Sequence, residues 1–197
     1  MCAAARRLTA AILAGGKNTR FGGSDKAFML IDGIPVIEVL AAKLANLFAE
    51  ILVVTNNPSR YNGFEGIVPV TDIIRDKGPL GGMHAAMKLA VAPAIFVIPC
   101  DMPFVDENII GKLIGQYESM PEAEALIPVL GESPEPLHAI YSTALVKDLE
   151  KFLASSPDLS VRRFISGLKA EYIKISETEK ARRAFTNINT PDDLPAQ

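Results

Sequence analysis

The stretch Leu8-Thr-Ala-Ala-Ile-Leu-Ala-Gly-Gly16 decides the fold, because a continuously apolar run passes directly into glycines. Such a run is typical of a strand that is covered on both faces, as in a parallel sheet. Similar short apolar runs occupy residues 51–55, 67–70 and 94–98, and patterns of helical periodicity occupy 35–48 and 80–91. Strands that alternate with helices predict an α/β protein with a mostly parallel sheet in a three-layer α/β/α arrangement.

The second half of the chain continues the same pattern. It predicts helices at 106–119, 144–153 and 159–168, strands at 125–130, 137–141 and 171–175, and a proline-rich loop at 131–136. No linker rich in glycine or serine separates the halves, and 197 residues suit one domain. We therefore expect a single domain over residues 1–197.

Composition excludes several classes of protein. With 20 basic and 23 acidic residues the net charge is -3, which indicates no nucleic-acid-binding surface. The two cysteines are too few for a disulfide scaffold, and no apolar run approaches the roughly 20 residues of a membrane span. Residues 1–16 resemble a secretion signal only in outline, since the apolar run is short and no clear cleavage site follows it. A cytoplasmic location without membrane contact is expected.

Positive charge gathers in the segment that follows the first strand. Residues 1–26 hold five basic side chains against one acidic side chain, and Arg20 and Lys26 share the loop with four glycines. Glycines let backbone N–H groups approach an anion closely, and the two cations suit a triphosphate. The spacing is neither that of a P-loop nor that of a dinucleotide fingerprint. The alternative is an ordinary glycine-rich connection with solvated charges.

Two other motifs follow predicted strands. Pro99-Cys-Asp-Met-Pro103 places Asp101 at the carboxyl end of the strand 94–98, where ligands bind in open α/β sheets. One carboxylate there can hold Mg²⁺ together with substrate phosphates, although Asp101 could instead satisfy the backbone of a turn. Gly78-Pro-Leu-Gly-Gly82, preceded by Asp72, offers small residues against which a base or ribose can lie, or simply begins a helix.

In this order the motifs resemble the molybdenum cofactor guanylyltransferases. The resemblance runs from Leu8 to about Leu194 and includes the late stretch Phe-Thr-Asn-Ile-Asn-Thr-Pro at 185–191. It implies a Rossmann-like nucleotidyltransferase fold and a Mg²⁺-dependent transfer of GMP from GTP to the terminal phosphate of molybdopterin, with release of pyrophosphate. It also implies a nucleotide-binding part at 1–103 and an acceptor-binding part at 104–197.

The resemblance also implies roles for individual residues. Arg20, Lys26 and Asp101 would be catalytic, with Asp101 as the metal ligand. Asn187 and Asn189 would contact the pterin, although from spacing alone they could be turn residues. The family often has an asparagine directly after its second strand, where this chain has Thr55, Asn56 and Asn57, so the residue that touches the base stays open. The expected nucleotide-binding set is Leu13, Ala14, Gly15, Gly16, Lys26, Thr55, Asn57, Asp72, Gly82 and Asp101.

Alternative functions remain at this point. A relative could use CTP, or a different phosphate acceptor such as a sugar phosphate, and a nucleotide-binding module could lack transferase activity. Arg162 and Arg163 either meet the phosphate of the second substrate or form a solvated helix face. His138 either packs internally or faces the acceptor, and we expect His84 and Cys100 to be packed residues. We expect a monomer that makes transient contacts with proteins of the cofactor pathway.

Overall fold

The computed structural model describes residues 8–15, 26–188 and 193. In this part of the chain, one sheet of eight strands has the order β10-β7-β9-β6-β1-β4-β5, and β8 pairs with β7. The parallel pairs are β1–β4, β1–β6, β4–β5 and β7–β10, whereas β9 and β8 run antiparallel to their neighbours. The predicted mostly parallel sheet is confirmed. Its strands are β1 (Leu8–Leu13), β4 (Ile51–Val54), β5 (Val68–Val70), β6 (Ala94–Pro99), β7 (Ala125–Leu130), β8 (Ser133–Pro134), β9 (Ala139–Ser142) and β10 (Ala170–Ile175).

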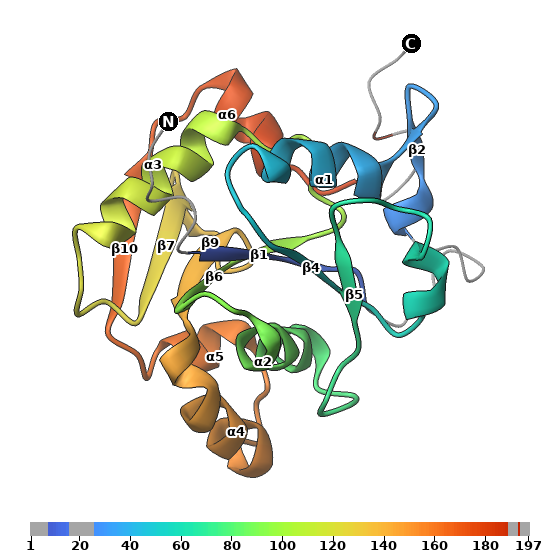
Figure 1. The fold of residues 1–197 in the computed structure, drawn as a ribbon. Helices are drawn as coiled ribbons and strands as arrows, with labels where there is room; N and C mark the ends of the chain where they lie inside the picture. Colours follow the sequence, from blue (N-terminus) through green and yellow to red (C-terminus); the bar gives the residue numbers. More distant parts are fainter. Residues whose placement is uncertain (1–7, 16–25, 189–192, 194–197) are drawn as a thin grey trace.

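Helices cover both faces of this sheet (Figure 1). On one face lie α1 (Val36–Ala45) and α3 (Glu107–Glu118), and their apolar stripes pack with Ile12, Phe96 and Ile98 in one buried cluster. On the other face lie α2 (Gly78–Leu89), α4 (Val146–Ser155) and α5 (Val161–Ile165), around a second cluster that includes Leu13 and Val97. Neighbouring residues of one strand thus enter opposite clusters, because successive side chains of a strand point to opposite faces. The predicted three layers are confirmed.

Strand β1 is an inner strand of the sheet. All six of its residues are buried, and it pairs with β4 on one side and β6 on the other. Ala10 and Ala11 face opposite layers at 0% exposure, so the helices on both faces approach the sheet closely. The chain therefore leaves the sheet at Ala14 between two inner strands, β4 and β6.

The structure corrects several expected boundaries. The loop 131–136 contains the short strand β8, and the helix expected over 159–168 is confined to α5, because Ser160 caps its start by accepting a hydrogen bond from the N–H of Arg163 (3.2 Å). A separate hairpin of β2 (Leu30–Ile31) and β3 (Ile34–Pro35) was not predicted. Asp32 and Gly33 between these strands both have positive φ, as a type I′ turn requires.

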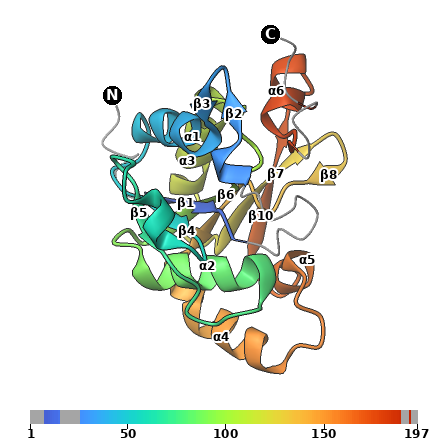
Figure 2. The ribbon, with the colours of Figure 1, turned by 90° about the vertical axis from the view of Figure 1, so that its right-hand side faces the viewer.

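The remaining elements are short. A last helix, α6 (Glu179–Ala184), lies beside α3 and packs Ala181, Ala184 and Phe185 against Ile109 and Leu130. Figure 2 shows the same arrangement from the side, with α1 and α3 separated from α2 and α4 by the sheet. No helix in the described residues has the length and apolar character needed to cross a membrane. Three single turns of 3-10 helix complete the described elements: η2 (Lys26–Phe28), η3 (Pro58–Tyr61) and η4 (Thr143–Leu145).

Candidate active site

The carboxyl edge of the sheet joins the first two sequence motifs. The N–H of Cys100 donates to the carbonyl of Leu13 (3.0 Å), and the N–H of Ala14 donates to the carbonyl of Val54 (2.9 Å). These bonds extend the ladder of β1 beyond its last residue, so that Gly15 and Asp101 leave the sheet next to each other. Of the predicted glycine-rich loop, the structure describes Gly15, which lies at the same edge as Asp101.

Lys26 and Asp101 form an ion pair at this edge. Lys26 Nζ lies 3.0 Å from Asp101 Oδ2, and the two side chains are 21% and 22% exposed. Lys26 begins the η2 turn and stands 75 positions before its partner in the sequence. Arg20 and Gly16, predicted in the same loop, and Asn189 lie outside the described residues. A partly screened ion pair that a ligand can still reach is suited to binding both a cation and phosphates.

The carboxylate of Asp101 fits a magnesium ion held partly by substrate. Mg²⁺ keeps several waters and usually takes one or two protein carboxylates together with phosphate oxygens. Within the described residues no group of three or more His, Cys, Asp or Glu side chains is arranged to hold a metal. A single accessible carboxylate such as that of Asp101 is compatible with such an ion.

A second group of predicted residues meets at the start of α2. A Cβ built on Gly82 would lie 3.0 Å from Leu13 Cδ2 and 3.8 Å from Asp72 Oδ1. Burial raises the pKa of the Asp72 carboxyl, and Asp76 adds to this effect while His84 opposes it. Glycine at this position thus lets the side chain of Leu13 pack directly on α2, close to the half-buried carboxylate of Asp72. An apolar side chain and a hydrogen-bond acceptor lie together here, and these are the groups needed to bind a nucleoside edge.

The turn after β4 holds three polar residues, Thr55, Asn56 and Asn57, which differ in burial and in contacts. Thr55 is buried, and its Oγ1 accepts a hydrogen bond from the N–H of Asn57 (3.2 Å), so the hydroxyl stabilises the turn itself. Asn56 is exposed, and its Nδ2 would lie 3.9 Å from a Cβ placed on Gly15. Asn57 is exposed too and precedes η3. Asn56, which the sequence analysis left out of the expected set, is the member of the three that stands beside the glycine loop.

The turn after α6 lies against the Asp101 loop. The N–H of Ile188 donates to the carbonyl of Asp101 (2.7 Å), and the neighbouring Asn187 is exposed. Two contacts of α6 hold it there. Lys180 Nζ lies 2.9 Å from Asp106 Oδ2, and the guanidinium of Arg183 stands 4.4 Å from the centre of the Phe104 ring. Residues from 74 to 87 positions apart in the sequence therefore share one corner of the site.

Comparison with known proteins decides the family. A family model described as a MobA-like NTP transferase domain matches residues 10–172. A molybdenum cofactor guanylyltransferase of Syntrophotalea carbinolica is 37% identical over 189 residues, covering 94% of this chain and 88% of that protein. The chain belongs to the molybdenum cofactor guanylyltransferases. It is therefore a nucleotidyltransferase, and the resemblance found in the sequence is confirmed.

Other relatives agree. A molybdenum cofactor guanylyltransferase of Desulfosudis oleivorans is 32% identical, covering 95% of this chain and 92% of that protein. The crystal structure of molybdopterin-guanine dinucleotide biosynthesis protein A from Archaeoglobus fulgidus superposes with a TM-score of 0.78 at 26% identity, and 95% of each chain is covered. The likeness thus extends over nearly the whole length of the chain.

Both histidines of this guanylyltransferase are packed residues. His84 is 1% exposed and its Nε2 lies 3.0 Å from Glu150 Oε1, which joins α2 to α4. His138 is fully buried, and the centre of its ring lies 5.2 Å from that of Phe96 and 4.5 Å from that of Phe185. Neither ring nitrogen has a hydrogen-bond partner among the described residues. Burial lowers the pKa of His138 to about 3. The possibility that His138 faces the acceptor is therefore wrong, because no part of the ring reaches the surface.

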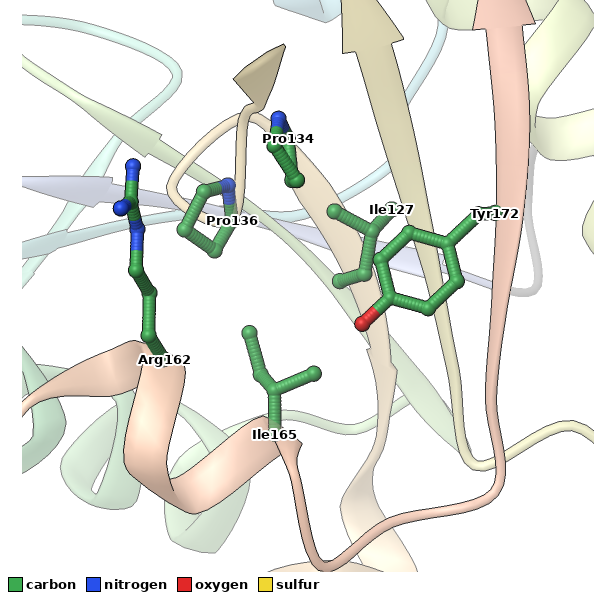
Figure 3. A pocket seen from close by; sticks show the side chains of 6 residues that line it. All are labelled: Ile127, Pro134, Pro136, Arg162, Ile165 and Tyr172. Carbon is green, nitrogen blue, oxygen red and sulfur yellow. The ribbon is translucent and has the colours of Figure 1, made fainter. Parts of the chain in front are cut away.

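A small pocket of about 240 Å³ opens on the α5 side of the sheet (Figure 3). Arg162 and Tyr172 stand on opposite sides of it, and Pro134, Pro136, Ile127 and Ile165 complete the wall. Tyr172 pairs with Ile127 across β10 and β7. Arg163, by contrast, does not line this pocket. Of the two arginines considered from the sequence, Arg162 is thus the one that lines this pocket.

The last predicted packed residue is Cys100. It is partly buried and packs against the cluster below α1 and α3. Its N–H bond to the carbonyl of Leu13 ties β6 to β1 directly beside Asp101. Cys100 thus supports the site through its backbone N–H and through its packing.

Proposed function

We propose that this chain transfers GMP from GTP to the terminal phosphate of molybdopterin and releases pyrophosphate. The observation that carries the proposal is the ion pair between Lys26 and Asp101, 3.0 Å long, at the carboxyl edge of the sheet. The chain that carries this pair is 37% identical to a molybdenum cofactor guanylyltransferase. The reaction needs a cation and a carboxylate at one place, with a nucleoside on one side and a phosphate acceptor on the other.

The chemistry is an in-line displacement at phosphorus. An oxygen of the acceptor's terminal phosphate forms a bond to the α-phosphorus of GTP, while the bond from that phosphorus to the bridging oxygen of the β-phosphate breaks. The electron pair leaves with pyrophosphate. The acceptor oxygen is already ionised at neutral pH, so no side chain has to remove a proton. Reactions of this type depend on positioning and on stabilising charge.

The charged residues divide this work. Asp101 would hold Mg²⁺, and this ion would neutralise charge at the reacting and leaving oxygens. Lys26 would turn from Asp101 toward the triphosphate, and Arg20 of the same loop would add a second cation. This is supported by the partial exposure of both members of the ion pair.

The nucleoside would lie between β1 and the start of α2. Leu13, Ala14 and Gly15 would contact it through the backbone, and Asp72 would accept hydrogen bonds from the base or ribose. The contact of Gly82 with Leu13 supports this placement, because it brings the end of β1, the start of α2 and Asp72 together. We add Asn56 to the set, since its side chain stands beside Gly15.

The acceptor would extend from Asp101 into the second half of the chain. Its pterin would lie near Asn187 and Asn189, because Ile188, which stands between them in the sequence, is bonded to Asp101. Another part of the acceptor would enter the pocket between Arg162 and Tyr172. That pocket, at about 240 Å³, is smaller than the roughly 300–1,000 Å³ of whole-ligand sites, which fits one part of a longer molecule. Burial raises the pKa of the carboxyl of Glu135, which stands between Pro134 and Pro136 in the sequence, and the charge of Arg162 opposes this effect.

The direct test is turnover with defined substrates. Purified protein is incubated with Mg²⁺ and molybdopterin, GTP or CTP is supplied, and pyrophosphate and the dinucleotide product are measured. Pyrophosphate that requires both GTP and the pterin supports the proposal. A preference for CTP would change the donor and keep the mechanism, and release with a sugar phosphate in place of the pterin would reject the acceptor. Nucleotide binding without pyrophosphate from any acceptor would indicate a binding module. The division into nucleotide and acceptor parts, the monomeric state, the transient contacts with pathway proteins and the cytoplasmic location stay predictions.

A further inference from the structure

The Asp101 loop is fixed from one side by the C-terminal segment 177–188. Three contacts of this segment reach the loop: Lys180 to Asp106, Arg183 to the Phe104 ring, and the N–H of Ile188 to the carbonyl of Asp101. Burial alone would raise the pKa of Asp106, but hydrogen bonds from Lys180 and from the N–H of Asn108 together lower it. The position of Asp101 therefore depends on where the segment after α6 is held.

The base of this segment rests on one side chain of the sheet. The ring of Phe185, the C-cap residue of α6, lies 4.5 Å from the ring of His138 at the start of β9, and His138 meets Phe96 of β6 edge-on at 5.2 Å. Ile188 follows Phe185 by three residues. His138 thus stands between the strand that carries Asp101 and the turn that is bonded to Asp101.

The state of this imidazole restricts what it can do. It is 0% exposed and neither ring nitrogen has a hydrogen-bond partner in the described structure. A buried polar group without a partner lowers stability relative to an apolar ring of the same shape. The imidazole cannot exchange protons with a substrate that it does not touch. What remains is the contact of its two faces and edges with Phe96 and Phe185.

We propose that His138 is a positioning residue, whose ring holds Phe185 and through it the turn 185–188 against Asp101. The proposal rests on the proposed function, since it takes Asp101 as the magnesium ligand and Asn187 as a contact of the acceptor. A ring of similar shape at position 138 keeps the turn in place. A small side chain lets Phe185 sink into the vacated space and draws Ile188 away from Asp101.

The test compares His138→Ala with His138→Phe in the full chain. Steady-state turnover is measured while Mg²⁺, pterin acceptor and GTP are varied separately. Mutation of a residue that holds a metal ligand in place typically changes metal affinity or activity about 10–100-fold. His138→Ala should therefore raise the half-saturating Mg²⁺ concentration about tenfold, and it should also raise the KM of the acceptor. The KM of GTP at saturating Mg²⁺ should change less than about twofold, within the scatter of context effects on distant sites. His138→Phe should restore all three values.

A purely structural role would give a different result, because the KM of the folded fraction does not depend on how much protein is unfolded. Leu149→Ala is the matched control: Leu149 is 0% exposed on α4 and belongs to the cluster on the other face. It should lose stability and keep the Mg²⁺ requirement. If His138→Ala does not fold, Phe185→Leu removes the ring contact while keeping apolar volume, and should raise the Mg²⁺ requirement too.

Different outcomes would reject the positioning role of His138 and the proposed function. Unchanged Mg²⁺ and acceptor dependence in a folded His138→Ala or Phe185→Leu protein would overturn the positioning role and leave the proposed function intact. Equal shifts in Leu149→Ala would also overturn it. Wild-type protein without guanylyl transfer would instead reject the proposed function, and the positioning proposal with it.

Discussion

Lys26 and Asp101 neutralise each other across 3.0 Å, and both side chains are partly buried. Asp101→Asn keeps the shape of the side chain but removes the charge that would hold Mg²⁺. We expect kcat/KM to fall by about 100-fold or more, the range found when one group that stabilises a transition state is lost. The measurement is pyrophosphate release as a function of Mg²⁺ concentration. Asp148→Asn, a change on the exposed face of α4, should have no effect. Normal Mg²⁺-dependent turnover of Asp101→Asn would show that the metal is held elsewhere.

His138 predicts a pH dependence of stability. Its pKa is about 3 in the folded chain and about 6.5 when unfolded, so between these values the unfolded chain binds a proton that the folded chain does not. The free energy of unfolding therefore falls as the pH drops below about 6.5, by up to about 1.4 kcal/mol per pH unit. His138→Phe lacks this loss. Urea unfolding at pH 7.5, 6 and 5 should show the stability advantage of His138→Phe growing by about 1 kcal/mol between pH 6 and pH 5. Parallel curves for the two proteins would mean that the folded state accommodates the charged imidazole.

At the scale of elements, the start of α2 is where backbone and ligand would approach most closely. Gly82→Ala improves helix propensity by up to about 1 kcal/mol, yet the new Cβ would meet Leu13 Cδ2 at 3.0 Å. Leu13 must then move into the nucleoside space, so we expect the KM of GTP to rise about tenfold, equivalent to about 1.4 kcal/mol of lost binding. The matched control is Gly111→Ala on α3, where an added Cβ meets nothing within 4 Å. The control should be stabilised and retain its KM; an unchanged KM in Gly82→Ala would place the nucleoside away from α2.

The elements also show what local sequence can and cannot predict. β1 and β7 were predicted with their observed bounds, because uninterrupted apolar runs are the signature of strands buried on both faces. The hairpin β2–β3 escaped prediction since its strands hold two residues each, too few for a period, although the Asp32–Gly33 pair carried the turn signal. That β9 runs antiparallel between β6 and β7 is a matter of long-range pairing, which no local pattern encodes.

At the scale of the whole molecule, the sequence located the site better than it described it. Motifs placed after strands predicted that Lys26 and Asp101 would meet, because parallel strands end at one edge. The roles of Thr55 and Asn56 depended on which side chain closes the turn, and that is decided by a single hydrogen bond. The pocket beside Arg162 is built from four separate segments, and the burial of His138 depends on α6 folding back over β9. Such features exist only once the chain is assembled.

Ligand binding to the whole molecule gives the last prediction. A nucleotide that binds only the folded chain stabilises it by RT ln(1 + [L]/Kd), about 2.7 kcal/mol at one hundred times Kd. With Mg²⁺ present, GTP should raise the melting temperature and CTP, ATP and UTP should raise it less, because the space between Leu13 and Asp72 would be filled by guanine. In Lys26→Ala the GTP shift should shrink, since a cation facing the triphosphate is gone, while Lys151→Ala on the exposed face of α4 should keep it. A shift of equal size for all four nucleotides would mean that binding is dominated by the triphosphate, and the choice of guanine would then have to be made when the acceptor binds.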